Sequence, residues 1–188
     1  MPRSKPGTFW GVAASVLLAD AFTKILAVDR LTPAYLPRPV IGDGVRLTLV
    51  YNPGAAFGLH LGAQSRWIFV GLTLVALTVL GRLYLDTPLA HRLRTLALAL
   101  VAGGALGNLL DRLKSARGVV DFIDVGVGAW RWPTFNLADI AVTSGAMLLG
   151  WVLWSADAAP AESTLVRATA DQPSVRAAAD QPSRGTSG

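Results

Sequence analysis

The chain has 188 residues, of which 52% are hydrophobic and only 15% are charged, whereas soluble domains usually carry about a quarter charged residues, so the composition favours lipid as the solvent. The net charge is +5, but the sequence has no cluster of basic residues interleaved with aromatic ones, which nucleic-acid binding would need. The absence of cysteine excludes thiol catalysis, thiolate metal sites and disulfides, and the two histidines, His60 and His91, lie in no motif typical of a zinc site or a serine triad.

Four segments are long and apolar enough to cross a bilayer, whose core of about 30 Å needs about 20 residues of helix. They are residues 9–28, 66–85, 93–112 and 135–154. A soluble helical bundle would need a polar face that repeats every 3.6 residues, and the second segment has none. The first segment has features of a secretory signal, but Asp20 and Lys24 interrupt it, so we expect an uncleaved span.

The segment between the first two spans, residues 29–65, has a different texture. Three prolines break helix formation, residues 41–44 (IGDG) form a turn signal, and residues 45–51 (VRLTLVY) are typical of a strand. We therefore predict a small β-rich platform at the membrane surface. The fold class is membrane all-α with a small β part: a bundle of four transmembrane helices.

The carboxyl-terminal residues are polar and rich in Ala, Pro, Ser and Asp. Residues 166–174 (VRATADQPS) are nearly duplicated as residues 175–183 (VRAAADQPS), and two such units are too few to form a repeat fold. The composition predicts a disordered tail over residues 156–188. Residues 1–155 form the predicted membrane domain.

With four spans, the ends of spans one and three and the starts of spans two and four face one compartment. The unusual polar residues are concentrated on that side: Lys24, Asn52, Asn108, Asp111, Arg112, Asp121, Asn136 and Asp139. Basic residues are equally numerous on both sides, so the positive-inside rule alone does not orient the chain. The convergence of polar groups from four segments predicts a functional site at one membrane face.

Within the first span, Asp20 and Lys24 are four residues apart and share a helix face. We favour a structural interpretation, in which this buried pair ties the first span to its neighbours. Asn108, Asp111 and Arg112 lie near the end of the third span, where packing and an anchoring polar network explain most of the pattern.

Two further acids could perform chemistry. Asp121 lies among apolar residues in the predicted loop after span three, and Asp139 lies near the start of span four. Two carboxylates in a poorly solvated site share one proton. The ionised one can take a proton from water, while the protonated one donates a hydrogen bond to the amide carbonyl and later helps to protonate the leaving amine. Two structural alternatives stay open: a helix-cap role for Asp139, and a salt bridge from Asp121 to Arg112 or Arg117.

Five blocks carry a resemblance to a known family: DAFTK (20–24), YNPGAAFG (51–58), GGALGNLLDR (103–112), VVDFID (119–124) and FNLADIAV (135–142). In order and spacing they resemble the lipoprotein signal peptidases, or signal peptidases II, over about residues 9–155. Ala21 stands where that family usually has glutamine. The resemblance implies an aspartic endopeptidase that removes signal peptides from prolipoproteins, cleaving before a cysteine that carries diacylglycerol.

The resemblance also implies roles for individual residues. Asp121 and Asp139 match the catalytic pair. The positions that match substrate-binding or site-supporting residues are Asp20, Lys24, Asn52, Gly54, Asn108, Asp111, Arg112 and Asn136. No metal or organic cofactor is implied.

The implied setting is the bacterial plasma membrane. Both termini would be cytoplasmic, and a β-cradle from the first loop would lie with the site at the extracytoplasmic face. The partners would be lipid-modified prolipoproteins and membrane lipid, and we expect a functional monomer because one chain supplies the site.

Three rival functions fit less well. A small transporter or channel would need polar residues through the bilayer depth, but spans two and four are nearly free of them beyond their outer ends. A non-catalytic assembly subunit would leave the apolar-flanked Asp121 without purpose. A presenilin-type protease would show a GxGD motif, which the sequence lacks.

Overall fold

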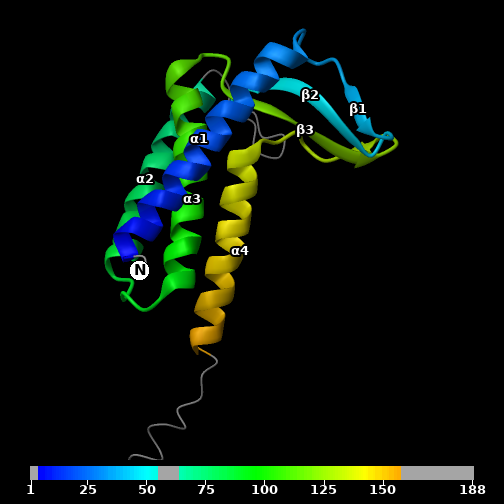
Figure 1. Ribbon diagram of the computed structural model, residues 1–188. Helices are drawn as coiled ribbons and strands as arrows, with labels where there is room; N and C mark the ends of the chain where they lie inside the picture. The colour runs from blue at the N-terminus through cyan, green and yellow to red at the C-terminus, as the bar shows by residue number, and fades with distance from the viewer. Residues whose placement is uncertain (1–3, 55–63, 158–188) are drawn as a thin grey trace, which may run out of the picture. The chain divides into compact units, whose positions relative to one another are not determined.

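The computed structural model describes residues 4–54 and 64–157, with side chains to residue 155 (Figure 1). Residues 158–188 of the predicted tail and the second half of the YNPGAAFG block, residues 55–58, lie outside the described residues. The elements are α1 (Lys5–Leu31), β1 (Arg38–Ile41), β2 (Val45–Asn52), α2 (Ser65–Leu85), α3 (Arg92–Lys114), β3 (Val119–Val127), β4 (Trp130–Arg131) and α4 (Leu137–Asp157). The chain divides into two compact units, Met1–Val152 and Leu153–Gly188. The predicted boundary after residue 155 stays a prediction.

Four helices are long and apolar enough to cross a membrane: α1, α2, α3 and, within α4, Leu137–Ser155. The predicted fold class is therefore confirmed. α2 begins one residue before its predicted span, while α1 extends beyond its span at both ends. Ser4 caps the amino end of α1 by accepting a hydrogen bond from the Gly7 N–H at 3.3 Å. At the other end, Ala27 and Leu31 pack against Leu49 of β2, so the last turn is held by the sheet.

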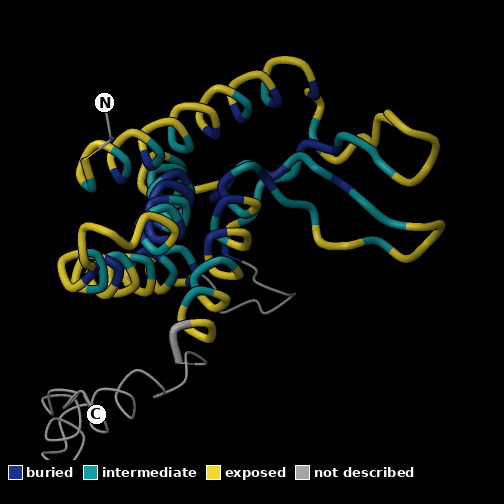
Figure 2. The backbone as a smooth tube through the Cα atoms, turned by 60° about the horizontal axis from the view of Figure 1, so that its bottom comes forward, coloured by how far each residue is buried: buried dark blue, intermediate teal, exposed yellow. Residues whose placement is uncertain are grey.

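α3 is the most buried of the four helices (Figure 2). In its apolar stretch of 18 residues, 56% is buried, compared with 6% in the corresponding stretch of α2. Its glycines allow this close packing, because a Cβ on Gly103 would lie 2.8 Å from the carbonyl oxygen of Ala13 on α1. The neighbouring Gly104 meets the backbone of Ala138 on α4 in the same way. α3 is thus the helix against which the others are placed.

The four-stranded antiparallel sheet has the order β1-β2-β3-β4. β1 and β2 come from the first loop, as predicted, but the segment after α3 was predicted to be a loop and forms β3 and β4 instead. That prediction was wrong because pairing with β2 makes the segment a strand: Val50 lies opposite Asp121, and Asn52 lies opposite Val119. Gly118 has φ 92°, and a Cβ there would overlap the Asn52 carbonyl.

α4 begins at Leu137, two residues later than its predicted span. Phe135 still belongs to the sheet, since its backbone N–H donates to the Ile123 carbonyl at 3.0 Å. Asn136 then lies between the sheet and the helix. The sheet therefore meets the bundle where α3 ends and α4 begins (Figure 1).

Candidate active site

Asn136 joins the two acids that the sequence singled out. Its side-chain Nδ2 donates to Oδ1 of Asp121 at 2.7 Å, and its backbone N–H donates to Oδ2 of Asp139 at 3.1 Å. The Asn136 side chain is fully buried. The Asp139 N–H in turn donates to Oδ1 of Asn136 at 3.0 Å, which makes a reciprocal cap at the start of α4. Asp139 is thus a cap, as one interpretation of the sequence held, and its other oxygen, Oδ1, accepts a hydrogen bond from Asn108.

Asp121 is nearly buried, with 3% of its surface exposed. Its Oδ2 accepts a hydrogen bond from Nδ2 of Asn52 at 3.2 Å, and Oδ1 of Asn52 accepts the Gly54 N–H at 3.0 Å, which orients the amide. Burial raises the pKa of Asp121 to about 7, and the charge of Asp139 acts in the same direction, while the hydrogen bonds from Asn52 and Asn136 oppose it. Asp121 can therefore hold a proton near neutral pH.

The salt bridge from Asp121 to Arg112 or Arg117 is not formed within residues 4–54 and 64–157. The Arg117 guanidinium lies 4.0 Å from the centre of the Tyr51 ring. Arg112 donates from Nη1 to the Asn108 carbonyl at 3.2 Å, and its buried Nε has no hydrogen-bond partner among the described residues. Arg112 thus offers an unused donor at the edge of the site.

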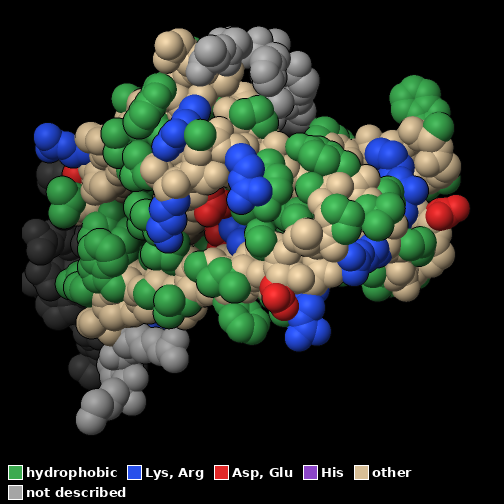
Figure 3. Space-filling view, turned by 90° about the horizontal axis from the view of Figure 1, so that it is seen from above, with side chains coloured by type: hydrophobic (Ala, Val, Ile, Leu, Met, Phe, Trp, Pro, Cys, Tyr) green, Lys and Arg blue, Asp and Glu red, His purple; other side chains and the backbone are tan. Residues whose placement is uncertain are grey.

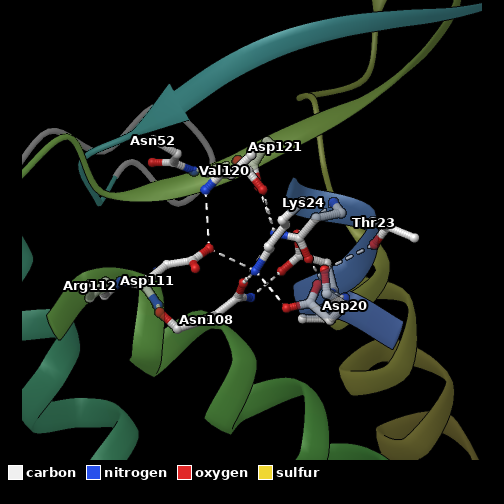
Figure 4. A network of polar contacts seen from close by, with 12 residues as sticks. Asp20, Thr23, Lys24, Asn52, Asn108, Asp111, Arg112, Val120 and Asp121 are labelled. Atoms are coloured by element: carbon white, nitrogen blue, oxygen red, sulfur yellow. Dashed lines mark hydrogen bonds and ion pairs between the residues drawn. The ribbon is translucent and has the colours of Figure 1, made fainter. Parts of the chain in front are cut away.

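Lys24 lies beneath the acids and is 4% exposed. Its ammonium is 2.8 Å from Oδ2 of Asp20, 2.8 Å from Oδ2 of Asp111 and 2.9 Å from Oδ1 of Asn108 (Figure 4). The other oxygen of Asp20 accepts the Ala138 N–H at the start of α4 at 3.0 Å. The Asp20–Lys24 pair therefore ties α1 to α3 and α4.

Asn108 and Asp111 carry this network to the two acid-bearing elements. Nδ2 of Asn108 donates to Oδ1 of Asp139 at 2.8 Å, and Oδ1 of Asn108 accepts from Nδ2 of Asn136 at 3.0 Å. Oδ2 of Asp111 accepts the Val120 N–H of β3 at 3.2 Å. Side-chain contacts thus link nine of the ten residues predicted for the site. Arg112, the tenth, donates to the backbone carbonyl of Asn108.

An apolar groove of about 340 Å³ opens beside Asp139. Viewed onto the end of the molecule that bears the sheet, acidic side chains lie among basic and hydrophobic ones (Figure 3). The other residues that line the groove are Trp132, Phe135, Ile140, Thr143, Ser144 and Met147. An apolar chain bound there would lie next to the Asp139 carboxylate.

The model of the signal peptidase (SPase) II family matches residues 12–155. The chain belongs to this family. A lipoprotein signal peptidase of Burkholderia mallei (strain SAVP1) is 46% identical over 142 residues, which cover 74% of this chain and 82% of the relative. That of Paraburkholderia phymatum is 47% identical over 141 residues, with the same coverage. A solved structure described as a bacterial membrane enzyme is 30% identical, with a TM-score of 0.71, and covers 79% of this chain and 88% of its own.

Membership of the signal peptidase II family makes this chain a peptidase. Among the described residues, no group of three His, Cys, Asp or Glu side chains could hold a metal ion. What the geometry does provide is a pair of carboxylates, joined through one asparagine, beside an apolar groove. That arrangement suits acid–base hydrolysis of an amide.

Asp124, which was not singled out from the sequence, organises the far part of the sheet in this signal peptidase II chain. Asp124 accepts hydrogen bonds from Arg46 at 3.1 Å, Thr48 at 3.1 Å and Arg131 at 2.8 Å, and Arg131 also donates to the Asp43 carbonyl at 2.7 Å. Burial would raise the pKa of Asp124, but these donors outweigh it and lower the pKa. The second acid of VVDFID was the available signal.

Proposed function

We propose that this signal peptidase II removes the signal peptides of prolipoproteins, cleaving before a lipid-modified cysteine, with Asp121 and Asp139 as its catalytic pair. The observation that carries the proposal is the bridge through Asn136, which holds one acid by its side chain and the other by its backbone. The curated relatives, named lipoprotein signal peptidases, support the substrate class.

In the proposed reaction, Asp121 starts protonated and Asp139 starts ionised. Burial favours the neutral form of Asp121, whereas Asp139 lies at the amino end of α4, where the helix dipole favours a negative charge. Asp139 takes a proton from a water molecule, and the oxygen of that water attacks the scissile carbonyl carbon. At the same time, Asp121 gives its proton to the carbonyl oxygen. The C–N bond then breaks as Asp139 protonates the leaving amine, and Asp121 regains its proton from a hydroxyl of the intermediate.

The surroundings of the acids supply substrate contacts. We assign the apolar groove beside Asp139 to the membrane-embedded part of the substrate, its acyl chains or the apolar part of its signal peptide. The guanidinium of Arg112, which is held through Nη1 by the Asn108 carbonyl, would donate to a substrate carbonyl. Asn52, whose amide is held by Gly54 and Asp121, would keep the acid oriented as the substrate enters.

The proposed setting follows from the substrate. A prolipoprotein presents its cleavage site at the outer surface of the plasma membrane, so we place the sheet and both acids at the extracytoplasmic face and both termini in the cytoplasm. Both acids and the asparagines that bind them come from one chain, which supports a functional monomer.

A cleavage assay with paired substrates tests the proposal. The protein, purified in lipid, is incubated with a prolipoprotein that carries diacylglycerol on its cysteine and with the same protein left unmodified. We expect one cut directly before the modified cysteine, read by product mass, and a rate about 10²-fold lower without the lipid, because remote binding energy contributes to turnover. Equal rates on both substrates, or a cut elsewhere, would contradict it.

A further inference from the structure

The mechanism above makes no use of the buried ammonium of Lys24. Within the described part of the chain, Lys24 forms no hydrogen bond or ion pair with Asp121 or Asp139; its partners are Asp20, Asp111 and Asn108. Burial of a lysine in a membrane-spanning helix is costly and needs a reason. Two acids already neutralise the ammonium, so its third contact, with Asn108, is the informative one.

That third contact, together with the one from Asn136, fixes which way the Asn108 amide points. Lysine can only donate hydrogen bonds, so Oδ1 of Asn108 must face Lys24, as it also faces Nδ2 of Asn136 at 3.0 Å. The Nδ2 group is thereby turned toward Oδ1 of Asp139, at 2.8 Å. A flipped amide would set two donors against its NH₂ group and an oxygen against the Asp139 carboxylate, and both contacts would be repulsive.

Lys24 also acts on the strand that carries the other acid. It holds Oδ2 of Asp111 at 2.8 Å, and the same oxygen accepts the backbone N–H of Val120 at 3.2 Å, one residue before Asp121. One side chain of α1 therefore controls a hydrogen-bond donor to Asp139 and the backbone next to Asp121 (Figure 4).

We propose that Lys24 is a positioning residue: by fixing the Asn108 amide and the Asp111 carboxylate, it presents Asp139 with a hydrogen-bond donor and holds β3 beside α4. The inference rests on the proposed catalytic pair. It assigns Lys24 no contact with substrate.

The charged groups that face this network come from four elements. They are Asp20 on α1, Asp111 and Arg112 on α3, Asp121 on β3 and Asp139 on α4. Removing the lysine charge alone would leave the buried Asp20 unpaired, which could unfold the protein. The test therefore starts from Asp20→Asn, whose remaining oxygen can still accept the Ala138 N–H.

In that background, Lys24 is changed to Met, which cannot donate, and to Gln, whose amide can still donate to Asn108. Each variant is purified in lipid, its unfolding temperature is recorded, and kcat, KM and the pH profile are measured on a lipid-modified prolipoprotein. Lys5→Met is the matched control, because Lys5 lies at the far end of the same helix and donates to the Thr87 carbonyl.

For the Met variant we expect kcat about 10²-fold below the Asp20→Asn parent with little change in KM, as for small misplacements of reacting groups. Its pH–rate profile should also differ from that of the parent, because the catalytic pair has lost a positioned hydrogen-bond donor. Gln should recover about tenfold of the lost kcat. Equal kcat in Met and Gln, or parental kcat with an unmoved pH profile in Met, would overturn the role of Lys24; if Asp121→Asn is inactive in the same assay, the catalytic pair still stands.

Discussion

Replacing Asp121 with Asn should make the protein more stable while it removes activity. In the native fold the pKa of this carboxyl group is raised to about 7, from an ordinary value of 3.8, so the group stays neutral at acidic pH. The unfolded chain ionises near the ordinary value, so it binds fewer protons than the fold between these two pH values. Stability is therefore lost as the pH rises from about 4 to about 7. Asn has no proton to lose and escapes this penalty.

The size of the effect follows from the pKa. At 1.36 kcal/mol per pH unit, the titration of Asp121 lowers the free energy of unfolding by about 4 kcal/mol at pH 8 and by about 1.5 kcal/mol at pH 5, relative to acidic pH. The new NH₂ group would face a donor, either Asn52 or Asn136, at a cost of about 1–3 kcal/mol. The variant should thus gain about 1–3 kcal/mol at pH 8, whereas at pH 5 its free energy of unfolding should lie between about 0.5 kcal/mol above and about 1.5 kcal/mol below that of the wild type.

The assay is thermal unfolding of both proteins at pH 5 and pH 8, followed by the fluorescence of the six tryptophans. A gain of this size raises Tm by about 2–4 °C per kcal/mol in a chain of this length. Asp29→Asn is the control, because Asp29 is exposed and, among the described residues, forms its one ion pair with its neighbour Arg30. A variant that is less stable than wild type at pH 8, or that differs equally at both pH values, would refute the reasoning.

Two other substitutions probe the parts that hold the site. Gly54→Ala should lower kcat by about tenfold or more. Gly54 has φ 121°, and a Cβ there would lie 2.8 Å from the Phe69 ring, so the substitution would move the backbone N–H that orients Asn52. Turnover is compared with that of Gly11→Ala, where a Cβ meets nothing within 4 Å. Arg131→Met should cost about 1–3 kcal/mol of unfolding free energy at pH 7, since Asp124 loses its 2.8 Å donor. The lowered pKa of Asp124 means that this loss should shrink as the pH falls through that pKa, which acid titration of Tm would show. Unchanged turnover in the first case, or a pH-independent loss in the second, would contradict these assignments.

The apolar spans could be predicted because lipid leaves a strong compositional signal. α2 was predicted from residue 66 and begins at Ser65, two residues before its apolar run starts at Trp67. The start of α4 was placed too early because Phe135 is as apolar as the helix that follows, and only its pairing with Ile123 assigns it to the sheet.

β3 was missed for a related reason. VVDFID carries β-branched residues but no clean alternation, so it resembled a loop until β2 paired with it. The sequence singled out residues that lie together in the structure, but the contacts between them could not be predicted. The spacing of Lys24 and Asn108 along the chain, 84 residues, gives no hint of the 2.9 Å between Nζ and Oδ1. Such contacts depend on how α1 packs against the glycines of α3.

The central claim is that Asp121 and Asp139 act together on one water molecule. It is tested most directly by measuring single-turnover cleavage of a lipid-modified prolipoprotein by Asp121→Asn and Asp139→Asn, each shown to be folded and inserted, beside Asp29→Asn. We predict that either change at the pair lowers the rate by at least about 10³-fold, since the acid or the base is lost, while Asp29→Asn cleaves at the wild-type rate. Turnover within about tenfold of wild type by either variant of the pair would contradict the claim.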